Sequence, residues 1–286
     1  MNYKDEIQKR QNSDDMLNCQ YAARFHFNRA ESLGYLAFII SVLSALCIFL
    51  PDSEKAIFIA IPIALDIATI AVQFYFDSIQ KTGAKLRNYF DAVVLGINES
   101  HYSVEEVKDI KKTVLKTISK NPNKHKLQIS NNGFDNPPGV KDWYDLSFDE
   151  KCINATFECQ KQNYHWTDNL ARKRKYISIG SIASIIIICA LAIKIFHLSP
   201  SKWIPCFIGL TLNQLINAIN IYKHSQLMHE IYTISRMPGI EDNSVQIIHL
   251  QNKINELREL PVLEINAIHK HYNKKWAEIY KNMIKK

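Results

Sequence analysis

Residues 142–176 gather side chains that could bind a flat and charged ligand. They include a Trp-Tyr pair, two amides and the basic run Arg172–Lys175. Aromatic rings stack on unpaired bases, amides hydrogen-bond to base edges, and arginine binds phosphate. The candidate ligand contacts in this stretch are therefore Trp143, Tyr144, Gln160, Asn163, Tyr164, Trp166 and Arg172.

Each of these candidates also has a purely structural explanation. The basic run lies where an apolar segment begins, so membrane topology alone would account for it. Trp143 and Trp166 could belong to a core or to an interface. Gln160 and Asn163 are three residues apart, on one face of a helix, where they could join two helices. The residue types leave both explanations open.

A second set of polar side chains lies within apolar sequence. On a helix, Asn217 and Asn220 follow Asn213 by four and seven residues, so the three amides share one face. Asp66 and Gln73 are seven residues apart and also share a face. Hydrogen bonds between helices would satisfy these groups and contribute roughly 0.6–2 kcal/mol each.

The alternative is that the same polar stripes line a path for water through the membrane. A carboxylate near the middle of a span costs roughly 2.5–3.5 kcal/mol, and such residues usually face a cavity, a partner or a pathway. Asp66 therefore favours this second explanation. A single chain with four spans encloses little space, so a path would require several copies of the chain around it.

The elements that must position these residues begin with four apolar runs. Each is long enough to cross a bilayer, which takes roughly 17–25 residues of helix. They pair into two hairpins, joined by the short turns 51–55 and 199–202. The runs cover residues 33–50, 56–76, 176–193 and 203–222.

Lysine and arginine counts predict the orientation of the hairpins. The N-terminal, central and C-terminal polar segments carry 5, 17 and 10 of these residues, and the two turns carry one each. By the positive-inside rule all three polar segments are cytoplasmic, with both termini inside. The predicted divisions are an N-terminal helix (1–32), hairpin 1 (33–76), a central sensing region (77–175), hairpin 2 (176–222) and C-terminal helices (223–286).

The polar segments read as helices. A capping box, Ser103 with Glu106, predicts a helix over 103–119, and a second box, Ser147 with Glu150, predicts a helix that runs into the third span. Asn, Pro and Gly predict a loop over 121–139. The tail 244–260 is helical, and Pro261 precedes another helical run. We therefore expect an all-α integral membrane protein whose long helices emerge into a helical cytoplasmic domain.

Enzymatic chemistry has little support in this sequence. It contains no phosphate-binding glycine loop, no His-Glu-x-x-His pair and no nucleophile elbow. The 6 cysteines and 10 histidines show no metal-ligand spacing. The expectation is a protein without catalytic residues, metal or cofactor.

Three stretches resemble a known family. "DWYDLSFDEKCINATFECQKQNYHWTDNLARKRKY" (142–176) carries a WY pair and then the pattern CQ-x-x-N-x-x-W, followed by an acid and L-x-R. "RQNSDDMLNCQYAARFHFNRAE" (10–31) has an R-Q-N helix start, and "DSIQKTGAKLRNYFDAVVLGI" (77–97) has an F-D pair. The chain thereby resembles the SMODS-associated four-transmembrane effectors of bacterial CBASS anti-phage systems. It departs from that pattern in Trp166-Thr167-Asp168, where the acid is shifted by one residue, and it lacks a tryptophan after the F-D pair.

The resemblance implies a membrane effector that senses a cyclic oligonucleotide in the cytoplasm and disrupts the bacterial inner membrane. It adds Phe90 and Asp91 to the predicted ligand contacts. The implied partners are the cyclic oligonucleotide, the lipid bilayer and further copies of the chain, with a tetramer plausible and no long nucleic acid. The alternative from another class is a scaffold membrane protein whose cytoplasmic helices bind a protein.

Overall fold

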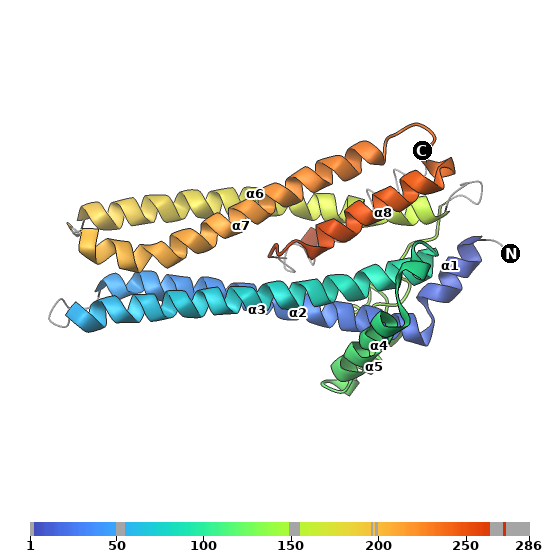
Figure 1. Cartoon of the computed structure of the whole chain (residues 1–286), viewed down its shortest axis with the longest axis horizontal. Helices are drawn as coiled ribbons and strands as arrows, with labels where there is room; N and C mark the ends of the chain where they lie inside the picture. Colours follow the sequence, from blue (N-terminus) through green and yellow to red (C-terminus); the bar gives the residue numbers. More distant parts are fainter. Residues whose placement is uncertain are drawn as a thin grey trace.

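The structure, a computed structural model, describes residues 3–49, 55–148, 155–195, 197, 200–263 and 271–272. These residues form helices and no strand. Two long helical hairpins dominate the fold and lie as two layers, with the helix ends that flank the two turns at the same end of the molecule (Figure 1). Their helices are α2 (Asp14–Leu46), α3 (Lys55–Leu95), α6 (Ala155–Ile195) and α7 (Pro200–Ile234). All four are long and apolar enough to span a membrane, which confirms the predicted all-α multi-pass fold.

The hairpin helices run unbroken from apolar into polar sequence. α3 and α6 each have 41 residues, and at 1.5 Å per residue such a helix is roughly 60 Å long. The hydrocarbon core of a bilayer is only about 30 Å thick. Each helix is therefore about twice as long as a span requires, and a single helix reaches from the apolar into the polar sequence.

The remaining helices lie at the polar end of the hairpins. They are α1 (Tyr3–Gln11), α4 (Val104–Ile118), α5 (Pro122–Ser130) and α8 (Ser244–Glu259). The capping box at Ser103 is confirmed, because Ser103 and Glu106 bond each other's backbone N–H groups. The loop predicted for 121–139 is wrong over its first part, where α5 forms. The Asn121 side chain caps that helix, and Pro122 provides a helix-compatible φ at its first position.

We call residues 3–32, 77–148, 155–175 and 223–263 the polar half, and the other described residues the membrane half. One apolar core holds the polar half together. It includes Ile7 from the N-terminal helix, Phe90 and Tyr144 from the central region, and Ile231 and Leu250 from the C-terminal region. This core joins the N-terminal helix, the central region and residues 223–263 into one helical body, while the predicted domain bounds stay a prediction.

Three features of the sequence prediction fall outside the described residues. They are Glu150 of the second capping box, most of the first hairpin turn, and most of the helical run expected after Pro261.

Candidate functional site

A buried carboxylate, Asp91, lies at the centre of the polar half. Its side chain is 0 % exposed and accepts bonds from four donors on three other segments. Three helices meet at this point, namely α8 and the polar-half parts of α3 and α6, together with the chain that follows α5. We define the Asp91 network as Asp91, Tyr144, Gln160, Asn163, Gln251 and Arg258.

Tyr144 donates its hydroxyl proton to Asp91 Oδ1 across 2.6 Å. Burial, followed by the charge of Asp91, raises the pKa of Tyr144 well above 10, so the hydroxyl stays protonated and remains a donor. The last residue of α1 fixes its position, because Gln11 Oε1 accepts from the Tyr144 N–H at 2.8 Å and Gln11 Nε2 donates to the Tyr144 carbonyl at 3.3 Å. Asn12 holds Asp142 in a similar way, with its Nδ2 donating to Asp142 Oδ1 at 2.7 Å.

Asn163 and Gln160 project from one face of α6 into the network. Asn163 Nδ2 donates to Asp91 Oδ2 at 3.2 Å and to the Tyr144 hydroxyl oxygen at 2.9 Å. Gln160 Nε2 donates to the carbonyl of Ile247 and to Gln251 Oε1, both at 3.0 Å on α8. Among the described residues, Gln160 Oε1 is buried without a hydrogen-bond partner. The network therefore retains one unused acceptor beside α8.

Two residues of α8 complete the network. Gln251 Nε2 donates to Asp91 Oδ2 at 3.2 Å. Arg258 Nη2 lies 2.7 Å from the same oxygen, and its Nη1 donates to Asn88 Oδ1 at 3.2 Å. A carboxylate removed from water needs a cation and several donors, and the C-terminal region supplies that cation. Sequence reasoning missed both residues, although Gln251 and Arg258 are seven apart on the apolar face of α8, which is a detectable signal.

Aromatic side chains lie around the network. The rings of Phe90 and Tyr144 are stacked with centroids 6.3 Å apart, and Phe90 is fully buried. Trp143 is 38 % exposed and packs its ring against the Arg87 guanidinium, 3.6 Å from the ring centroid. One member of the Trp-Tyr pair thus faces the core and the other faces the surface.

The remaining candidates on α6 lie outside the network. Tyr164 is half-buried and packs against the core. Trp166 is half-buried and meets the ring of His165 edge-on. Arg172 pairs with Asp168 on the exposed side of the helix, one turn away. The structure therefore brings together Phe90, Asp91, Tyr144, Gln160 and Asn163, and it leaves Trp143, Trp166 and Arg172 nearer the surface.

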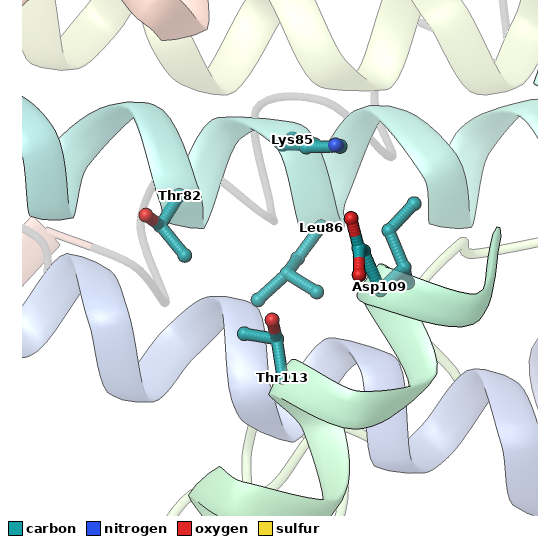
Figure 2. Close-up of a pocket in the computed structure, with 6 residues that line it drawn as sticks. Thr82, Lys85, Leu86, Asp109 and Thr113 are labelled. Atoms are coloured by element: carbon teal, nitrogen blue, oxygen red, sulfur yellow. The ribbon is translucent and has the colours of Figure 1, made fainter. Parts of the chain in front are cut away.

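A small cavity lies between α3 and α4, where Leu86 and Thr113 point toward each other (Figure 2). Its volume is about 40 Å³, whereas pockets for small-molecule ligands usually measure roughly 300–1,000 Å³. It is too small for a nucleotide. Within the described ranges, no group of three metal-ligating side chains could hold an ion.

Some polar residues of the membrane half contact another helix or the tail, and others bond within their own helix. Asn213 Nδ2 donates to Ser41 Oγ of the other hairpin at 3.1 Å. Asn220 Nδ2 donates to the carbonyl of Pro261 at 3.1 Å. Gln73 Nε2 donates to Asp77 on its own helix, and Asn217 is half-buried one turn from Asn213.

Asp66 occupies an unusual position between the hairpins. Its carboxyl group lies directly against Gly209 of α7, in the space that a Cβ at position 209 would need. Gly209 precedes Asn213 by four residues, so it extends the amide stripe by one turn. Sequence reasoning missed it, because a glycine in an apolar run has many ordinary explanations.

Comparison with known proteins adds a decisive observation. Residues 5–203 match the family model of the SMODS-associating 4TM effector domain. The chain belongs to this family. No curated protein and no solved structure matches the chain.

As a SMODS-associating 4TM effector, the chain is a CBASS-type membrane effector. The matched region contains four of the six residues of the Asp91 network, namely Asp91, Tyr144, Gln160 and Asn163, and also the adjacent Phe90. It ends within α7, so Gln251 and Arg258 lie beyond it. The buried carboxylate of the effector domain is thus neutralised by an arginine from outside the matched region.

Proposed function

We propose that this chain is an inner-membrane effector that senses a cyclic oligonucleotide through a cytoplasmic polar half and then permeabilises the membrane, which arrests growth. One observation carries the proposal. Two of the stretches that resemble the family pattern meet in the Asp91 network, and Gln11 of the third stretch bonds to the backbone of Tyr144. That network joins helices that continue into both hairpins. The chain acts by binding and rearrangement, without catalysis.

The position of the network suggests how a ligand is read. Trp143, Trp166 and Arg172, which lie nearer the surface than the Asp91 network, bind the nucleotide first, through stacking and phosphate contacts. The amide of Gln160 is already bonded to α8 through Ile247 and Gln251. A base edge that takes over the Gln160 amide displaces those two contacts. Ligand binding and movement of α8 are therefore coupled.

Assembly of several copies is the proposed source of the membrane lesion. Only 6 % of the most apolar part of the third span is buried, compared with 33 % for the fourth span. Its exposed side chains include Ile186, Ile187, Ile188 and Leu191. Neighbouring copies pack against this face, and a tetramer would place four pairs of hairpins around one axis.

Dye release from liposomes tests the proposed function. Full-length protein is reconstituted, and cyclic di- and trinucleotides are added, with their linear forms as controls. At least one cyclic compound is expected to release dye. Arg172→Ala should raise the half-maximal ligand concentration by about tenfold, the equivalent of one lost phosphate contact.

Lys175→Ala is the matched control for Arg172→Ala, because Lys175 is an exposed member of the same basic run. Equal responses of the two variants would assign the run to topology and remove Arg172 from the site. Absence of both binding and release with every cyclic compound would contradict the proposed function and favour the scaffold alternative.

A further inference from the structure

A short segment, Arg258–Leu263, consists of the end of α8 and the four residues that follow it, and it contacts all four membrane helices. Its backbone carbonyls accept bonds from three of them. Gln80 of α3 donates to the carbonyl of Arg258 at 3.4 Å, and Asn220 of α7 donates to that of Pro261 at 3.1 Å. Arg174 of α6 donates to the carbonyl of Leu263 at 3.5 Å. Both hairpins are thus tied to the same six residues.

The contact with α2, the fourth helix, is steric. A Cβ built at Gly34 would lie 2.5 Å from Leu263 Cδ1. The leucine side chain therefore fills the space that any larger residue at position 34 would occupy. Its neighbour Val262 is 2 % exposed. The segment is packed into the bundle and does not lie over its surface.

The four contact points lie at one level of the molecule. Gly34, Gln80, Arg174 and Asn220 are each within four residues of a predicted span end, at 33, 76, 176 and 222. These are the ends at which the spans enter the polar half. The segment therefore crosses the bundle of four membrane helices at the level where the spans enter the polar half.

Arg258 couples this segment to the Asp91 network. Its guanidinium pairs with Asp91, while its carbonyl accepts the bond from Gln80. Gln251, which bonds to Asp91, and Arg258, which begins the segment, both lie on α8. This helix therefore connects the Asp91 network to the segment as one rigid element. In Figure 1, α8 runs back beside α7 toward the membrane half. A movement of α8 thus displaces the segment as well.

We propose that Arg258–Leu263 is an autoinhibitory clamp that holds the two hairpins in their resting arrangement. Beyond the end of α8, the residues Leu260–Leu263 are held by single side-chain contacts and by one short-range backbone bond, from Val262 N–H to the Leu260 carbonyl, so few bonds must break to release them. Its effect on permeability rests on the proposed function. Its effect on hairpin spacing does not.

Hairpin spacing is measured by electron spin resonance on the full chain in nanodiscs. Spin labels are attached through unnatural amino acids at the exposed positions Lys81 of α3 and Lys223 of α7. Gly34→Leu displaces Leu263, and Asn220→Leu removes the donor to Pro261. Both variants should shift or broaden the distance distribution, and both should release dye without nucleotide at several times the wild-type rate.

Gly133→Leu is the control, because a Cβ at Gly133 meets nothing within 4 Å and Gly133 lies outside the four spans. It should leave the distance and the leakage unchanged. A wild-type distance distribution in both Gly34→Leu and Asn220→Leu would overturn the clamp. So would altered spacing with wild-type leakage, provided that wild-type protein responds to nucleotide. If no protein leaks under any condition, the proposed function fails, while the distance measurement still decides whether the clamp sets the spacing.

Discussion

The two halves of the molecule are held together in different ways. In the polar half, four segments converge on Asp91, whose carboxylate receives donors from Tyr144, Asn163, Gln251 and Arg258. In the membrane half, the described polar contacts between hairpins are few. Asn213 bonds to Ser41, and Asp66 lies against Gly209.

Apolar packing is also more extensive in the polar half than in the membrane half. The core of the polar half draws on every major helix, whereas the buried cluster near the hairpin turns consists of Cys47, Ile48 and Cys206 with a few neighbours. Lipid tails are as apolar as leucine, so spans gain little from contact with one another beyond close packing and hydrogen bonds. The polar half therefore holds the helices together through more contacts than the membrane half does.

The largest expected effect comes from removing the network's cation. Arg258→Met leaves the Asp91 carboxylate buried without a counter-charge, which typically costs about 3–5 kcal/mol. We expect a decrease of that size in the free energy of unfolding, measured by denaturation in mixed micelles. Asp91→Asn in the same chain should recover part of the loss.

Lys253→Met is the matched control, because Lys253 also lies on α8 and pairs with Glu230 and Glu256 at 3.1 Å. Both partners are half exposed, and such pairs contribute about 0–1 kcal/mol. Equal losses in the two variants would contradict the view that the polar half depends on its buried ion pair.

A smaller effect is expected in the membrane half from Gly209→Ala. The added Cβ collides with the Asp66 carboxyl group, and overpacking of this kind costs about 1–3 kcal/mol. Asp66→Ala should rescue the variant, and Gly180→Ala, where there is open space, should show no loss. Denaturation in mixed micelles checks all three. Failure of the rescue would show that the two residues do not meet.

The amide contact between hairpins should contribute less still. Ser41→Ala removes the acceptor of Asn213 and should cost about 0.6–2 kcal/mol. A double-mutant cycle with Asn213→Leu isolates the pair. Additive losses would mean that the bond does not form, and the stripe would then be available to line a path.

The smallest effect is a shift in alkaline stability. Burial, followed by the charge of Asp91, raises the pKa of Tyr102 from 10 to about 12. The unfolded chain therefore loses this proton first, and folding stability decreases as pH rises from 10 to 12. Tyr102→Phe should flatten the decline of Tm above pH 10 by a few degrees, whereas Tyr232→Phe, at an exposed tyrosine, should leave it unchanged.

Much of the architecture could be predicted. A long apolar run with few or no charged residues is enough to identify a span, and capping residues mark where helices begin. The helix α5 was missed, since Asn121 and Pro122 are typical of loops as well as of helix starts. Of the Asp91 network, residue types or the family resemblance had singled out Tyr144, Gln160, Asn163 and Asp91, and their role as ligand contacts stays a prediction.

The contributions of the C-terminal region could not be found in this way. Arg258 follows Asp91 by 167 residues, and an arginine on a soluble helix usually faces solvent. Its pairing depends on α8 folding back between the hairpins. The contact of Leu263 with Gly34 also depends on this folding back of the C-terminal region. The lack of a side chain at Gly34 becomes important only because Leu263 occupies the space beside it.

The most direct test of the account locks α8 in place. Asn98, just after α3, donates from its side chain to that of Asn252 on α8 at 3.1 Å; Asn98 is half-buried and Asn252 is exposed. A disulfide between Asn98→Cys and Asn252→Cys would tie α8 to α3. Oxidised protein should release no dye from liposomes with a cyclic oligonucleotide that activates wild type, and reduction should restore release. Full release from the oxidised protein would contradict the claim that α8 must move before the membrane half rearranges.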